Sequence, residues 1–169
     1  MFYQDADANR IMQVPVEGGT PLAVPGSTIA GATFSFRDIA ISPDGRTLAV
    51  VITLITRREH NGPPQQKIAL ITLNEGPNPS VRLIDPDPRI SDPPIFTPDG
   101  KTLLYAITEN GVGNLWVQPV SDGRGHQITN FTSQQIGHYQ FSPDGKNLLL
   151  HQRHTDRNIV LLRDTAVQQ

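Results

Sequence analysis

One eleven-residue pattern occurs three times in this chain: ISPDGRTLAVV from Ile41, FTPDGKTLLYA from Phe96 and FSPDGKNLLLH from Phe141. Each copy has an apolar residue, a Ser/Thr-Pro-Asp-Gly tetrad, a basic residue and then an apolar run. In such a tetrad Pro presets φ for the second position of a type I turn, Asp tolerates the third, and Gly takes the positive φ that follows. The pattern therefore predicts the same β-hairpin three times.

The repeated turn residues are expected to be structural. One Asp recurs at the same position of each hairpin, which favours a role in the fold over three equivalent catalytic acids. The hydroxyls of Ser42, Thr97 and Ser142 are expected to cap their own turns, and each Gly is expected to have a positive φ. The predicted turn residues are Pro43, Asp44, Gly45, Pro98, Asp99, Gly100, Pro143, Asp144 and Gly145.

Other segments repeat around each hairpin. A short apolar segment before each turn predicts a first strand, and the Leu-, Val- and Ile-rich run after it predicts a second strand buried on both faces. A third strand follows at Ile11, Ile68, Leu115 and Ile159, and the short segments PLAV, VRLI and HQIT predict outer fourth strands. Four short antiparallel strands that recur roughly every 40 to 50 residues are typical of a propeller blade.

On these repeats the chain resembles the TolB-like, WD40-like family of Pro-Asp repeats, which build bacterial β-propellers. The resemblance covers nearly the whole chain and is carried by the three Pro-Asp-Gly hairpins at matching positions. It implies an all-β fold, a β-propeller of four-stranded antiparallel blades. It does not imply one chemistry, because such propellers serve as binding platforms, as sensor domains behind kinases or transcription regulators, and as gating domains of peptidases.

The repeats predict one partial propeller domain with four successive blades. Residues 1–33 hold the end of the first blade without its first strand, 34–87 and 88–131 hold two full blades, and 132–169 hold a fourth blade without its outer strand. A closed ring takes about four to eight blades. We therefore expect the remaining blades of a longer parent chain, or self-association of this one, to complete the structure.

Composition excludes several classes of function. The 14 basic and 16 acidic residues give a net charge of −2, which provides no field for a nucleic acid backbone, so no nucleic acid partner is expected. The longest apolar run, residues 47–56, is far shorter than the roughly 20 residues of a spanning helix, so no membrane insertion is expected. The first residues, MFYQDADANR, do not resemble a signal peptide. The compartment, periplasm or cytoplasm, stays open.

No catalytic, metal or cofactor site is expected within the chain. There is no cysteine and no GxSxG motif, and the prominent serines lie in turns. The segment DADAN has oxygen ligands at alternate positions, but Arg10 replaces the Gly and Val16 the Glu of a calcium loop, so a polar turn is the better interpretation. A zinc site needs three or four convergent ligands, which the five histidines do not supply.

The predicted binding site lies on the face opposite the hairpin tips, where loops connect second to third strands and one blade to the next. The loop TRREHNGPPQQK is the most distinctive insertion, and insertions in repeat proteins cluster on the binding face. The alternative is a solvated loop stiffened by its prolines. The candidate binding residues are Arg37, Arg57, Arg58, Glu59, His60, His138, Tyr139, Arg153 and His154.

The predicted function is a non-catalytic binding or scaffold segment for a protein, a peptide or a small molecule, within the C-terminal sensor or interaction region of a larger bacterial protein. Two alternatives place the activity outside this chain: the regulatory or gating propeller of a serine/threonine protein kinase or a prolyl-oligopeptidase-like peptidase, and the sensor region of a transcription regulator. A third is a structural fragment without independent function. Trp116 is predicted to pack between blades rather than to form a ligand platform.

Overall fold

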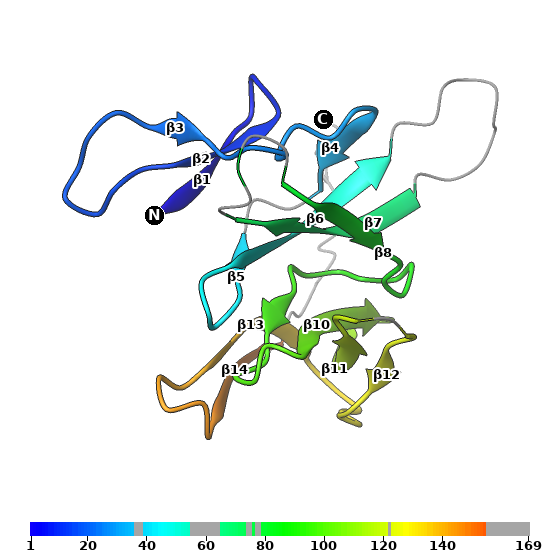
Figure 1. Ribbon diagram of the computed structural model, residues 1–169. Coiled ribbons are helices and arrows are strands. Elements are labelled where there is room, and N and C mark those ends of the chain that lie inside the picture. Colours follow the sequence, from blue (N-terminus) through cyan, green and yellow to red (C-terminus); the bar gives the residue numbers. More distant parts are fainter. Residues whose placement is uncertain (36–38, 55–64, 74–75, 77–78, 122, 155–169) are drawn as a thin grey trace, which may run out of the picture.

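The computed structural model describes residues 1–35, 39–54, 65–73, 76, 79–121 and 123–154. Every regular element in these residues is a β-strand, and the strands form four antiparallel sheets, which we name A to D in chain order (Figure 1). This confirms the predicted all-β class. Within the described residues no helix is long and apolar enough to cross a membrane.

Sheet A corresponds to the first predicted blade. It contains β1 (Phe2–Asp5), β2 (Arg10–Gln13) and β3 (Leu22–Ala23), in the order β1-β2-β3. These are the second, third and fourth strands of a blade, because β1 aligns with the strands that follow the hairpins in the later repeats.

Sheet B has the order β4-β6-β7-β8, with β5 also paired to β6. Its first strand is divided, because β4 pairs with one end of β6 and β5 with the other. Of these two segments, the sequence predicted only β5. The second blade was expected to start at residue 34, but β4 already begins at Ala32. The strands are β4 (Ala32–Phe34), β5 (Ala40–Ile41), β6 (Thr47–Leu54), β7 (Gln65–Thr72) and β8 (Val81–Ile84).

Sheet C repeats this arrangement with the order β12-β11-β10-β9. Its first strand is also divided, because Ile90 forms an isolated bridge to β10 ahead of β9. The strands are β9 (Ile95–Phe96), β10 (Thr102–Glu109), β11 (Val112–Pro119) and β12 (His126–Gln127).

Sheet D pairs β13 (Gln135–Phe141) with β14 (Leu148–Arg153), the first and second strands of the fourth predicted blade. The third strand predicted near Ile159 lies outside the described residues. The register of β13 shifts between Ile136 and His138, which marks a β-bulge. A bulge inserts one residue into a strand and reverses the faces of the residues beyond it.

The three Pro-Asp-Gly turns are hairpins, as predicted, and share one hydrogen-bond pattern. In the first, the Ser42 hydroxyl donates to Asp44 Oδ1 over 2.6 Å and accepts from the Thr47 amide over 2.9 Å, while the Arg46 amide donates to Asp44 Oδ1 over 3.0 Å. Gly45 has φ 71° and donates its amide to the Ser42 carbonyl over 2.8 Å. The other two hairpins repeat these contacts around Thr97, Asp99, Gly100, Ser142, Asp144 and Gly145.

The carboxylates of the three turns make the stability of the fold depend on pH in the acidic range. Hydrogen bonds from the Ser or Thr hydroxyl, and then from the backbone amide, lower the pKa of Asp44, Asp99 and Asp144 below the ordinary 3.8. A carboxyl whose native pKa is lowered stabilises the fold above its unfolded pKa, and this contribution is lost as pH falls through the native pKa. We expect Asp99→Asn to destabilise the chain most near neutral pH and progressively less below about pH 4. Urea denaturation over a pH series measures this, and a loss independent of pH would contradict it.

Successive sheets pack face to face through apolar cores. In β6, Ala49 and Val51 join a cluster with Tyr105 of sheet C, whereas Leu48 joins a cluster with Ile11 of sheet A. The same alternation in β10 directs Leu103, Tyr105 and Ile107 toward sheet B, and Leu104 and Ala106 toward sheet D. The predicted burial of second strands on both faces is therefore confirmed for β6 and β10, but it is wrong for β14, which exposes Leu149 and His151 on one face.

Trp116 on β11 is partly buried and packs against the core between sheets B and C, as predicted. The Arg89 guanidinium lies 5.3 Å from the centroid of its ring and forms ion pairs with Asp87 at 2.7 Å and Glu109 at 2.9 Å. These contacts attach the segment that connects sheets B and C to the long hairpin of sheet C. Trp116 therefore has a packing role, which its sequence position indicated.

Candidate functional site

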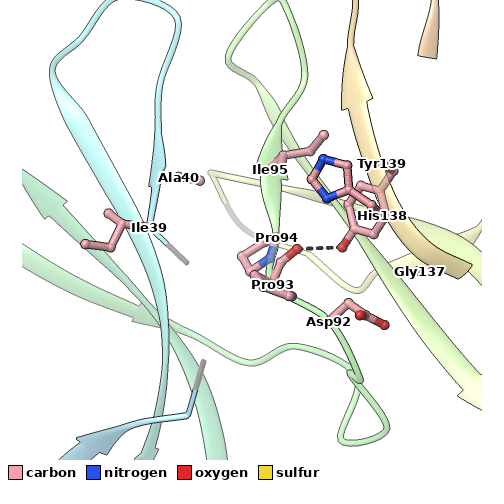
Figure 2. Close-up of a pocket in the computed structure, with 9 residues that line it drawn as sticks. All are labelled: Ile39, Ala40, Asp92, Pro93, Pro94, Ile95, Gly137, His138 and Tyr139. Carbon is pink, nitrogen blue, oxygen red and sulfur yellow. Dashed lines mark hydrogen bonds between the residues drawn. The ribbon is translucent and has the colours of Figure 1, made fainter. Parts of the chain in front are cut away.

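A hollow of about 160 Å³ opens where the first strands of sheets B, C and D approach one another. These strands are innermost in a propeller blade and border its central channel. Figure 2 shows Ile39 and Ala40 on one side, Pro93 and Pro94 in the middle, and the residues of β13 on the other side. The lining residues are Ile39, Ala40, Asp92, Pro93, Pro94, Ile95, Gly137, His138 and Tyr139.

Tyr139 fixes one wall of the hollow. Its side chain is buried, its hydroxyl donates to the Pro93 carbonyl over 2.5 Å (Figure 2), and it accepts from the Ala106 amide over 3.2 Å. The sequence predicted Tyr139 as a surface contact for a ligand. The bulge after Ile136 turns Tyr139 into the core between sheets C and D, so its hydroxyl has a structural role.

Asp92 lines this hollow, and the pKa of its carboxyl is raised. Burial raises the pKa of its carboxyl, while a hydrogen bond from the Ser91 hydroxyl and the charge of Arg153 act in the opposite direction. Ser91 Oγ donates to Asp92 Oδ2 over 2.9 Å, and no residue in the described ranges donates to Oδ1. A half-buried carboxylate with a vacant oxygen suits a ligand that brings a hydrogen-bond donor or a positive charge.

The structure brings together some of the predicted binding residues. His138 is exposed and lines the hollow, and Arg153 at the end of β14 is close enough for its charge to act on Asp92. His154 is exposed directly after β14. The other predicted residues, Arg37, Arg57, Arg58, Glu59 and His60, lie outside the described residues.

Asp92 and Pro93 were not among the predicted binding residues. They lie in the segment ISDPPIF, residues 90–96, which aligns with the whole of β13 when the repeats are matched on their Pro-Asp-Gly turns. His138 and Tyr139 were selected for this position in the fourth blade. The same alignment applied to the third blade would have selected Pro93 and Pro94, directly after Asp92.

The described residues contain no group of three or more His, Asp or Glu side chains arranged to hold a metal ion. The carboxylates of the three hairpin turns each accept hydrogen bonds within their own turn, and the described residues that line the hollow include one carboxylate and one imidazole. The geometry of this hollow is suited to binding through Asp92 and His138.

No protein-family model matches this chain. The crystal structure of TolB from Acinetobacter baumannii is similar, with a TM-score of 0.57 and 22% identity over 90% of this chain and 37% of that chain. The structure of a Mycobacterium tuberculosis puromycin-hydrolyzing peptidase is similar, with a TM-score of 0.57 and 17% identity over 82% of this chain and 23% of that chain. This chain therefore spans less than half the length of either protein.

At these identities the two comparisons concern the fold alone. Together with the four successive antiparallel sheets, they support a TolB-like propeller fold, in which the described sheets do not close into a ring. The hairpin repeats thus led to the correct architecture.

Proposed function

We propose that this chain is a non-catalytic propeller segment that binds a polypeptide at the hollow between the first strands of sheets B, C and D. The observation that carries the proposal is the half-buried Asp92 carboxylate, whose Oδ1 has no donor among the described residues and which lies beside the exposed imidazole of His138. In this proposal an apolar side chain of the partner enters the hollow, and a donor next to it binds Asp92. The chain then acts as the interaction region of a larger bacterial protein.

Asp92→Asn is expected to affect binding and stability in opposite directions. Because burial raises the native pKa of Asp92, its ionised form destabilises the fold at neutral pH, and this penalty disappears as pH falls through the native pKa. The variant should therefore melt at a higher temperature than wild type at pH 7. It should also lose affinity, by about tenfold, for peptides selected by display on the wild-type chain.

Asp7→Asn is the matched control, because it removes an exposed carboxylate outside the hollow. It should change neither the melting temperature nor peptide affinity. Selected peptides that bind Asp92→Asn and His138→Ala as tightly as wild type would refute this site, and a display selection that returns no peptide would refute the proposed function. A gate or sensor attached to an enzyme is the second candidate, which the likeness to a peptidase structure favours.

A further inference from the structure

The fourth blade has an unusual surface on the face of sheet D that points away from sheet C. Leu148 and Leu150 pack against the core between sheets C and D, so the alternate residues of β14 point to the opposite face. Their partners on β13 are His138, opposite His151, and Gln140, opposite Leu149. We call this surface the outer face of sheet D, formed by His138, Gln140, Leu149, His151 and Arg153.

The two preceding blades have apolar residues at the matching positions of their second strands. In sheet B these are Ala49 and Val51, and in sheet C Leu104 and Ala106, all four of them almost completely buried by the sheet that follows. In sheet D the matching residues are Leu149, which is 54% exposed, and His151, which is exposed. Of these two positions, which form a core between the other blades, one therefore keeps an apolar residue in sheet D and the other holds a histidine.

The ionisable side chains of this face are all hydrogen-bond donors, and none of them is a carboxylate. His138, His151 and Arg153 all offer N–H donors, and Arg153 carries a positive charge. No ion pair joins them to a carboxylate within the described ranges, although the charge of Arg153 acts on Asp92. In a chain whose net charge of −2 counts histidines as neutral, this face therefore presents one cation and two imidazoles that can donate hydrogen bonds. It is complementary to carboxylates.

The spacing along β14 favours an extended acidic partner. Leu149, His151 and Arg153 lie at alternate positions, so their side chains repeat every 6.5 to 7 Å or so along the strand, as do the side chains on one face of an extended peptide. Two carboxylates at alternate positions of such a peptide match His151 and Arg153, and Leu149 offers an apolar contact at the end of this row. Three separated groups do not form the continuous basic stripe that a phosphate backbone needs.

We propose that the outer face of sheet D binds an extended acidic peptide segment of a partner protein, with its carboxylates on Arg153, His151 and His138. This adds a second binding surface to the proposed function. It shares His138 with the hollow but does not use Asp92, because an acidic segment gains nothing from that carboxylate.

The test uses fluorescence anisotropy with a labelled peptide of alternating Glu and Leu, and the same peptide with Gln in place of Glu. The whole chain should bind the Glu peptide at least about tenfold more tightly, and added salt should weaken this binding. Arg153→Gln and His151→Gln should each lose several-fold to about tenfold in affinity. Lys146→Gln, which removes an exposed cation from the hairpin tip of the same sheet, should leave the affinity unchanged.

Three results would overturn the proposal: equal binding of the Glu and Gln peptides, equal losses for Arg153→Gln and Lys146→Gln, or tighter binding of a single-stranded oligonucleotide than of the Glu peptide. Asp92→Asn separates this site from the hollow. It should not weaken binding of the Glu peptide, although it should weaken the binding assigned to the hollow by about tenfold. The effect of Asp92→Asn on the two kinds of peptide therefore shows which of the two proposed sites is wrong.

Discussion

Gly145→Ala is expected to destabilise this chain by about 2–4 kcal/mol, clearly more than the same substitution at Gly45. Both glycines have φ 71°, a conformation that costs an alanine about 1 kcal/mol. A Cβ at Gly145 would also lie 2.7 Å from Cβ and 2.9 Å from Cγ of Pro98 in the neighbouring hairpin, whereas a Cβ at Gly45 meets nothing within 4 Å. The additional cost of about 1–3 kcal/mol measures the contact between blades.

Urea denaturation of the two variants gives the comparison directly, provided that both unfold with the slope of the wild-type chain. Gly100→Ala is a further reference, because its Cβ would lie 3.4 Å from Pro43 Cδ, an ordinary van der Waals distance. It should therefore resemble Gly45→Ala. Equal losses at Gly45 and Gly145 would show that the hairpin tips of sheets C and D do not pack together.

Tyr105→Ala is expected to cost about 3–5 kcal/mol, and Tyr105→Phe about 1–3 kcal/mol. The ring is completely buried between sheets B and C. Its hydroxyl donates to Gln118 Oε1 over 3.2 Å and accepts from the Asp87 amide over 3.3 Å. Gln118 is also buried and donates to the Asp85 carbonyl over 2.7 Å. Loss of the hydroxyl therefore leaves a buried acceptor and a backbone amide without their partner.

The matched control is Tyr3→Phe. Tyr3 occupies the position of Tyr105 in the first repeat, but it is 40% exposed on sheet A. Its replacement should change the free energy of unfolding by less than about 0.5 kcal/mol. A loss at Tyr105→Phe no larger than that at Tyr3→Phe would contradict the role assigned to the buried hydroxyl.

The hairpins and the second strands were predictable because their signals are local. Proline, aspartate and glycine at consecutive positions determine the turn through their own φ preferences and a hydrogen bond from the neighbouring hydroxyl. The apolar run after each turn similarly indicates burial on both faces. Matching three such copies was sufficient to predict a propeller blade.

The divided first strands were not predictable in this way. Ala32–Phe34 is a short segment whose strand character depends on pairing with Ile52–Leu54, a partner distant in the sequence. The bulge in β13 had a similar effect on the site. Uninterrupted alternation would place Ile136 and His138 on one face and Tyr139 on the other, and the inserted residue reverses this assignment.

By itself, the sequence determined the hairpins, the strand order within each blade and the blade architecture, because each depends on residues that are near one another in the repeat. Only the tertiary structure decided which repeats meet. It placed Asp92 beside His138 and Tyr139, left Gly45 open while packing Gly145 against Pro98, and buried Tyr105 while exposing Tyr3. These differences arise among equivalent positions of one repeat because the packing of one sheet on the next, rather than the residue type, sets their environment.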